Sequence, residues 1–246
     1  MNKMIFAALL LFIPIFSFAD SAQYPYPGFH KYFQTLGYNF TLGLISSENL
    51  KPLYIGGIAT GVAYGFDDTL SHKLSPYAKQ IGEAGQILGS PFVMGLTAAS
   101  LVAVPFTENQ KFRAFAFDLS QSLIIEYVIV NATKKAVGRT RPNGHPGDSF
   151  PSGHAGDSFV LAGVVNHYYG KKWGFAAYSL AAFVGFSRVE KGKHFPSDVV
   201  MGSTIGYITT ASVLRNNNAR AMKKVSMMPF VGRKSCGVDV LINMGR

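Results

Sequence analysis

Three separated stretches of this sequence, residues 134–142, 150–154 and 187–198, carry side chains that suit the binding and transfer of a phosphoryl group. The first contains Lys134 and Arg141, and ammonium and guanidinium groups match phosphate oxygens in charge and hydrogen-bond geometry. Seven positions separate the two residues, which is close to two turns of helix, so we expect both cations on one helix face. The Pro-Asn-Gly sequence that follows predicts the end of this helix, close to both charges.

The second stretch predicts the start of another helix. Ser152, Gly153 and His154 precede an apolar run over residues 158–165, so Ser152 or a neighbour can occupy the N-cap position. The free N–H groups of a helix start attract an anion. This turn is therefore a second candidate for phosphate contact.

The third stretch supplies Arg188, His194 and Asp198. Four positions separate the histidine from the aspartate, and at a helix start this spacing allows the carboxylate to meet the imidazole. A histidine paired in this way can act as a nucleophile or move a proton.

The order of these residues resembles the motifs of the phosphatidic acid phosphatase type 2 superfamily. Those motifs are a lysine, six residues and Arg-Pro, then Pro-Ser-Gly-His, then Ser-Arg, five residues, a histidine, three residues and an aspartate. Every motif position is filled here, over residues 134–198. The chain is identified on this ground as a bacterial, exported member of the superfamily, which also includes the vanadium haloperoxidases. The resemblance implies a helical core, but it does not imply one substrate.

The resemblance also implies a covalent mechanism. His194 would attack phosphorus in line and form a phosphohistidine, while Asp198 would hold the tautomer of the ring and stabilise the charge that it gains. His154 would give a proton to the leaving oxygen and then activate the water that breaks the intermediate.

The remaining motif positions would bind the phosphate. Phosphoryl transfer asks mostly for positioning and for neutralisation of charge on the equatorial oxygens. The resemblance implies that no metal ion and no other cofactor is required. The implied phosphate-binding groups are the side chains of Lys134, Arg141, Arg188 and Ser152 and the N–H of Gly153.

Hydrophobic segments predict an all-α fold, an up-and-down bundle of about six helices. Because short loops join antiparallel neighbours, the end of the third helix, the start of the fourth, the end of the fifth and the start of the sixth should lie on one side. Those four ends carry the residues of the three motifs. The predicted helices cover residues 53–66, 91–105, 112–138, 153–169, 173–188 and 195–214.

Polar residues near the motifs have more ordinary interpretations. Arg139 lies off the face shared by the motif cations, so we expect it to be solvated. His145 and Asp148 flank the second motif, where loop polarity explains them as well as a contact of His145 with the leaving group does. The pair Asp67-Asp68 has no further metal ligands around it and predicts a turn after the first helix.

The pattern along the chain predicts one phosphatase domain behind a targeting segment. Residues 1–19 have a basic start, an apolar run and small residues before a cleavage position, as in a secretory signal peptide. The phosphatase domain would cover residues 20–246, with an irregular lead-in over residues 20–50 and a helical core over about 53–214. A short hairpin tail is predicted over about 225–244 from two strand-like runs, joined to the core by a polar linker over residues 215–224.

Composition narrows the partners and the location. A net charge of +10 favours anionic membrane surfaces and phosphorylated substrates, whereas the basic residues lack the aromatic platform of a nucleic-acid site. Uninterrupted apolar runs fall short of the roughly 20 residues that span a bilayer. We therefore expect an exported, periplasmic bundle, with attachment to or embedding in the inner membrane as the alternative. Nothing in the sequence indicates the oligomeric state.

These observations favour a phosphatase acting on a phosphomonoester or pyrophosphate, most plausibly lipid-linked. A soluble acid phosphatase of broad specificity is the nearest alternative. A vanadium haloperoxidase would use the same residues to hold vanadate, and a non-enzymatic phospholipid-binding protein would need the cations alone. The intact His154, His194 and Asp198 disfavour the binding protein.

Overall fold

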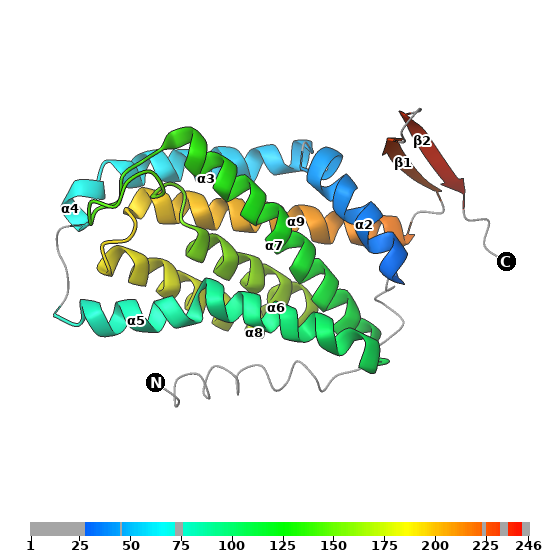
Figure 1. The fold of residues 1–246 in the computed structure, drawn as a ribbon, viewed down its shortest axis with the longest axis horizontal. Coiled ribbons are helices and arrows are strands. Elements are labelled where there is room, and N and C mark those ends of the chain that lie inside the picture. Colours follow the sequence, from blue (N-terminus) through cyan, green and yellow to red (C-terminus); the bar gives the residue numbers. More distant parts are fainter. Residues whose placement is uncertain (1–27, 45, 72–75, 223–224, 232–235, 243–246) are drawn as a thin grey trace.

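The computed structural model describes residues 28–44, 46–71, 76–222, 225–231 and 236–242. Figure 1 shows long helices lying side by side along one axis, which confirms the prediction of an all-α bundle. The predicted signal peptide lies outside the described residues.

Five long helices make up most of the bundle, and each contains one or two of the predicted segments. Helix α9 packs against α3, α7 and α8, and α5 packs against α8. The predicted positions agree with the observed helices to within a few residues at most ends. The bounds are α3, Ser47–Tyr64, α6, Ser90–Ala103, α7, Gln110–Val137, α8, Gly153–Glu190, and α9, Pro196–Met222.

Helix α8 reverses direction in its middle. Gly170 has φ 81° and ψ 177°, a conformation outside the helical region that separates the two predicted helices, residues 153–169 and 173–188. His154 in the first turn and Arg188 in the last both contact Gln86 of α5, so the two halves return to the same end of the bundle. The chain reversal required by the up-and-down prediction is therefore present.

The prediction missed four short helical segments. The expected irregular lead-in was wrong for its described part, because residues 28–43 and 47–50 are helical. The expected polar linker was also wrong up to residue 222, because α9 continues through it. Segments α2 and α5 are amphipathic, so they lack the continuous apolar runs on which the prediction relied. The missed segments are α2, Gly28–Tyr38, the π-helix η3, Asn39–Gly43, α4, Asp67–Ser71, and α5, Ala78–Leu88.

The principal core lies between α7 and the first half of α8. Phe115 and Leu119 of α7 pack with Val160 and Val164 of α8, and all four side chains are almost fully buried. Burial of a side chain of this size stabilises the fold by about 1.5–3 kcal/mol. This packing fixes α7 and α8 relative to each other and so fixes the loop between them.

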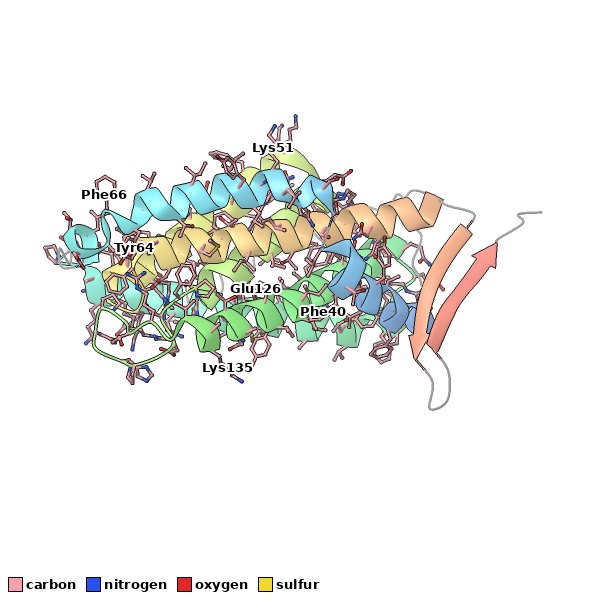
Figure 2. All side chains as sticks on the ribbon, turned by 90° about the horizontal axis from the view of Figure 1, so that it is seen from above. Phe40, Lys51, Tyr64, Phe66, Glu126 and Lys135 are labelled. Carbon is pink, nitrogen blue, oxygen red and sulfur yellow. The ribbon has the colours of Figure 1, made fainter. Side chains whose placement is uncertain are left out.

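Large apolar side chains also cover much of the outside. Tyr54 and Val62 of α3 are 71% and 60% exposed, Val102 of α6 is 69% exposed, and Tyr127 of α7 is 56% exposed. Figure 2 shows charged Lys51 and Lys135 on the outside of the bundle and Glu126 within it. Two helical segments, Ala78–Phe106 and Gln110–Val137, are long and apolar enough to cross a membrane by length and composition.

The predicted hairpin is present at the C-terminal side. Strands β1, Val225–Val231, and β2, Cys236–Ile242, pair antiparallel, with Val225 opposite Ile242 and Val231 opposite Cys236. Both strands lie within the predicted range of about 225–244.

Candidate active site

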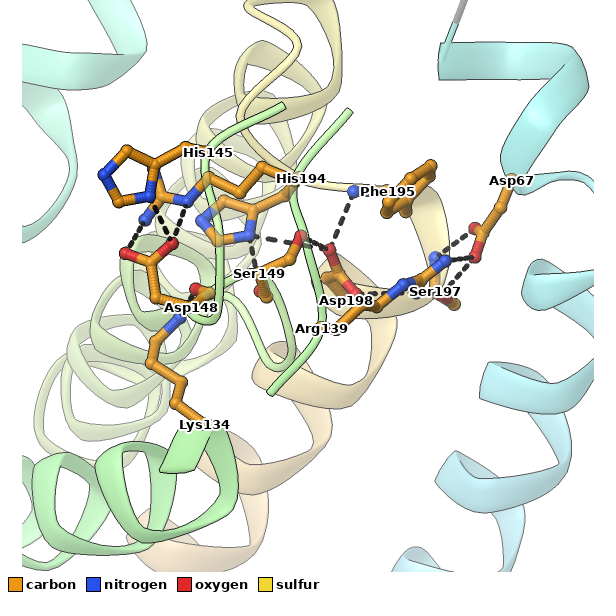
Figure 3. A network of polar contacts seen from close by, with 11 residues as sticks. Asp67, Lys134, Arg139, His145, Asp148, Ser149, His194, Phe195, Ser197 and Asp198 are labelled. Atoms are coloured by element: carbon orange, nitrogen blue, oxygen red, sulfur yellow. Dashed lines mark hydrogen bonds and ion pairs between the residues drawn. The ribbon is translucent and has the colours of Figure 1, made fainter. Parts of the chain in front are cut away.

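The three motifs meet at one end of the bundle. This end gathers the last turn of α7, both ends of α8 and the first turn of α9, together with the loops over residues 138–152 and 191–195. Figure 3 shows two groups of polar contacts in these loops, one around Asp148 with Lys134 and His145, the other from His194 through Asp198 to Asp67.

The two cations of the first motif do not share a helix face, contrary to the prediction. Helix α7 ends at Val137 because Gly138 adopts a left-handed conformation, φ 60°, and its N–H bonds back to the carbonyl of Lys134. Arg141 therefore lies in the following loop. The loop nevertheless brings Arg141 close to Lys134, because both side chains contact Asp148.

Asp148 occupies the donors of both cations. The Nε and Nη2 atoms of Arg141 donate to its two carboxylate oxygens at 2.6 and 2.7 Å, and Lys134 Nζ donates to its backbone carbonyl. The exposed ring of His145 also contacts this carboxylate, at 3.2 Å. A bidentate guanidinium–carboxylate pair is the arrangement that a phosphate would replace.

His194 is buried and has a fixed orientation. Its Nδ1 lies 2.7 Å from the carbonyl oxygen of Ser149 and 3.6 Å from Oδ2 of Asp198. A carbonyl oxygen can only accept, so Nδ1 carries the hydrogen and Nε2 keeps its lone pair. Burial is the largest cause that lowers the pKa of His194, which keeps the ring neutral.

Asp198 is fully buried and its carboxylate is held by several donors. Ser149 Oγ and the backbone N–H of Phe195 donate to Oδ2 at 2.5 and 2.8 Å, and Arg139 Nη1 donates to Oδ1 at 2.8 Å. Burial alone would raise the pKa of Asp198, but these hydrogen bonds and the charges beside it leave that pKa below its ordinary value. Asp198 is therefore ionised beneath the imidazole.

Arg139 is not solvated, contrary to the prediction. Its guanidinium bridges Asp198 and Asp67, with Nη2 at 2.7 Å from Oδ2 of Asp67, and stacks 3.9 Å from the ring centre of Phe195. Its side chain is 20% exposed. Asp67 also accepts hydrogen bonds from the backbone and hydroxyl of Ser197, so it begins α4 as a buried anchor. The turn predicted near it falls at Gly65 and Phe66.

His154 faces a partner that the sequence prediction missed. Its Nε2 lies 3.1 Å from the amide nitrogen of Gln86, whose Oε1 accepts from Arg188 Nη1 at 2.8 Å. Burial, and then the positive charges of Arg188 and other site residues, lower the pKa of His154 to about 3. The ring is neutral when the site holds no anion.

Two buried polar atoms of the site have no hydrogen-bond partner among the described residues. These are Ser152 Oγ and Arg188 Nε, on residues that are 0% and 3% exposed. Ser152 occupies the N-cap position of α8, but its hydroxyl does not cap the helix. Because unpaired buried donors are costly, these two atoms favour the binding of an anionic acceptor next to the helix start at Gly153.

The geometry brings together every residue predicted for the site and adds Gln86, Asp67, Arg139, Asp148 and Ser149. Within the described part of the chain, no three His, Cys, Asp or Glu side chains are grouped to hold a metal ion. Gln86 and Asp67 lie far from the motifs in sequence, and no local pattern marks them. Ser149 gives its carbonyl to His194 and its hydroxyl to Asp198, but a single serine in a polar loop forms no pattern that sequence could single out.

Comparisons with known proteins agree with this arrangement. The family model of the PAP2 superfamily matches residues 115–221, which include all three motifs. A lipid A 1-phosphatase of Porphyromonas gingivalis is 37% identical over 83 residues, which are 32% of this chain and 19% of that relative. The match therefore spans about a fifth of the relative's length.

Two solved structures resemble the fold. The first transmembrane PAP2 type phosphatidylglycerolphosphate phosphatase from Bacillus subtilis has a TM-score of 0.58 at 17% identity and covers 73% of this chain and 99% of its own. LpxE of Aquifex aeolicus has a TM-score of 0.49 at 22% identity, over 62% of this chain and 94% of its own.

Proposed function

The chain belongs to the PAP2 superfamily, and from this premise we propose that it is a metal-independent phosphatase acting on a lipid-linked phosphomonoester or pyrophosphate. The observation that carries the proposal is the pair of unpaired buried donors, Ser152 Oγ and Arg188 Nε, beside two neutral histidines. A tetrahedral dianion would supply the acceptors that these donors lack.

In the first step His194 is the nucleophile. Its Nδ1–H bond to the Ser149 carbonyl leaves the lone pair of Nε2 free to form a bond to phosphorus, while the bond from phosphorus to the leaving oxygen breaks. The ring gains positive charge as the bond forms. Asp198, ionised at 3.6 Å from Nδ1, stabilises that charge.

The cations and helix start bind the transferring group. Lys134, Arg141 and Arg188 neutralise the equatorial oxygens, and Ser152 Oγ and the N–H of Gly153 donate to them. Arg141 can turn from the Asp148 carboxylate to phosphate without leaving the site, since both acceptors take two parallel N–H bonds.

His154 completes both steps by moving a proton. The leaving alkoxide takes a proton from the imidazolium, which becomes neutral as the product departs. The neutral ring then takes a proton from water, whose oxygen attacks the phosphohistidine and frees His194 and inorganic phosphate. These roles need no redox chemistry.

A lipid substrate fits the outer surface. The apolar side chains exposed on α3, α6 and α7, the two candidate spans and the net charge of +10 suit contact with an anionic bilayer. The relatives named for lipid A and phosphatidylglycerolphosphate point to the same class of substrate. We place the protein in or on the inner membrane, with its site on the periplasmic side.

The test is phosphate release by the purified protein in EDTA. Wild type and His194→Ala would be compared on phosphatidic acid, undecaprenyl pyrophosphate and a soluble aryl phosphate. We expect release that favours a lipid and falls by a factor on the order of 10⁴ or more in the variant. Equal turnover in the variant would exclude His194 as the nucleophile.

The substrate pattern separates the alternatives. Preference for the aryl ester would indicate an acid phosphatase of broad specificity, and halide oxidation on addition of vanadate would indicate a haloperoxidase. Binding of a phospholipid without release would indicate a binding protein.

A further inference from the structure

Gln86 of α5 lies between the two ends of α8. Its Oε1 accepts from Arg188 in the last turn, and its Nε2 contacts His154 in the first turn. Two glycines allow this close approach. A Cβ on Gly85 would lie 1.7 Å from Ser187 Oγ, and a Cβ on Gly89 would lie 2.5 Å from Cδ2 of His154.

Hydrogen-bond directions in this bridge are fixed by the arginine. A guanidinium can only donate, so the oxygen of the Gln86 amide must face Arg188 and its NH₂ must face His154. An amide nitrogen also only donates. Nε2 of His154 is therefore the acceptor, and the ring is neutral with its hydrogen on Nδ1.

This state conflicts with the acid role of His154. An imidazolium carries hydrogen on both nitrogens, so whichever nitrogen faces the leaving oxygen, the N–H at Nε2 would point at the amide NH₂ of Gln86. Protonation thus requires the amide to rotate. Rotation would point the NH₂ at Arg188 instead, and two donors cannot face each other while the guanidinium remains in place.

Phosphate binding removes this obstacle. Arg188 already has an unpaired buried Nε, so its donors can pass to a phosphate oxygen and release Oε1 of Gln86. The freed amide can then rotate and accept from Nε2–H of a protonated His154. The negative charge of phosphate also favours protonation of His154, because it offsets the positive charges of Arg188, Arg141 and Lys134.

From these contacts we infer that Gln86 is a positioning residue that couples occupancy of the phosphate site to protonation of His154. This inference rests on the proposed function, and it adds a residue from a helix that carries no motif. The proton comes from solvent when phosphate binds, and His154 passes it to the leaving oxygen.

The charged groups that act most strongly on His154 are positive. Arg188, His194, Arg141 and Lys134 face it from the end of α8, the loops and α7. On α5 the acidic residue is Glu83, which is exposed one turn before Gln86. Asp157, one turn further along α8, is held by Ser90 and Glu126, so the Gln86 amide is the group in contact with Nε2 of His154 that can accept from it.

The test uses tungstate, a dianion that resembles phosphate and has no proton of its own near neutral pH. Calorimetry in two buffers of different ionisation enthalpy gives the protons taken up on binding, as a function of pH. Wild type should take up about one proton per tungstate, and His154→Gln should take up none.

Two substitutions of Gln86 should act in opposite directions. In Gln86→Glu the pH at which uptake is half lost should rise by about one unit or more, because a carboxylate stabilises the imidazolium. In Gln86→Leu this pH should fall, because the imidazolium loses its acceptor. The alkaline limb of kcat should move in the same two directions. Gln80→Glu and Gln80→Leu, at an exposed position of α5, are matched controls and should behave as wild type.

If Gln86 had only a structural role, both Gln86 variants would be impaired, but the pH at which proton uptake is half lost would not move in either. That result would overturn the inference. Binding of tungstate to wild type without proton uptake would also overturn it, whether or not the variants fold. Failure of the proposed function is a different result. It would be absence of phosphate release from every substrate, while the tungstate midpoints still shift.

Discussion

The two ends of the bundle both bury polar side chains, but they differ in the kind of group that is left unpaired and in the charge around it. At the far end, Asp118 precedes Lys134 by 16 positions in α7, about 24 Å along the helix. Its carboxylate accepts from Tyr168 at 2.6 Å and from Asn217 at 2.7 Å. Gln121 of the same helix extends this network to Asn39 and Thr35, and the unpaired atom among these side chains is an acceptor, Oδ1 of Asn39.

At the site end, two buried donors, Ser152 Oγ and Arg188 Nε, lack an acceptor among the described residues. The cations Lys134, Arg141 and Arg188 all act on His154, and Arg141 is paired with the carboxylate of Asp148. A network whose donors are paired stabilises the fold without a ligand. Unpaired buried donors beside cations favour the binding of an anion, and this separates a binding region from a structural one.

The strongest way to test this contrast is to remove one cation from the site. Arg188→Ala should lower kcat/KM by about 10²- to 10³-fold, because the transition state loses a buried charged donor. Steady-state kinetics on the preferred lipid would measure this loss. Asn217→Ala at the far end should keep kcat/KM within about threefold of wild type. Similar losses in both variants would contradict the division between the two ends.

A smaller effect is expected from changing Asp67, the buried carboxylate that pairs with Arg139. Asp67→Asn weakens the contact with Arg139 that holds Asp198, and should lower kcat by about tenfold with little change in KM. The neighbouring Asp68→Asn is the control, because Asp68 is exposed. Equal kcat values for Asp67→Asn and wild type would show that the anchor does not position the site.

The far end should respond in stability and not in turnover. Tyr168→Phe removes a donor from the buried Asp118 carboxylate and should lower the free energy of unfolding by about 1–3 kcal/mol. Thermal unfolding in detergent would detect this as a fall in Tm of several degrees. Tyr127→Phe, at an exposed position, should leave Tm unchanged. A loss of kcat without loss of stability in Tyr168→Phe would show that the far end takes part in the reaction.

The smallest effect is a change in how stability depends on pH. Burial and the charge of Arg188 lower the pKa of His154 to about 3, whereas in the unfolded chain it is about 6.5. Between these values the unfolded chain binds the proton and the folded chain does not, so stability falls as pH falls from about 6.5 to 3. His154→Gln should reduce this slope and leave stability above pH 7 unchanged. Parallel unfolding curves for the two proteins across the range would contradict the neutral state of His154.

The location of the site was predictable because its parts lie at helix ends. Once the hydrophobic pattern showed helices joined by short loops, the alternation of direction placed His154, Arg188 and His194 on one side. The same argument failed for Lys134 and Arg141, because the Gly138 turn ends α7 four residues after the lysine. The loop that follows restores their proximity through Asp148, which a helical spacing rule does not describe.

The sequence by itself determined the residue types and their order, and these were enough to predict the helical class, the family resemblance and a phosphate site. The tertiary structure decided the partners. Arg139 proved to be an internal ion pair, Ser149 supplied the acceptor for His194, and Gln86 joined His154 to Arg188. The physical reason is that a motif records short-range spacing, whereas hydrogen-bond directions and burial arise from elements far apart in the chain, which packing alone brings together.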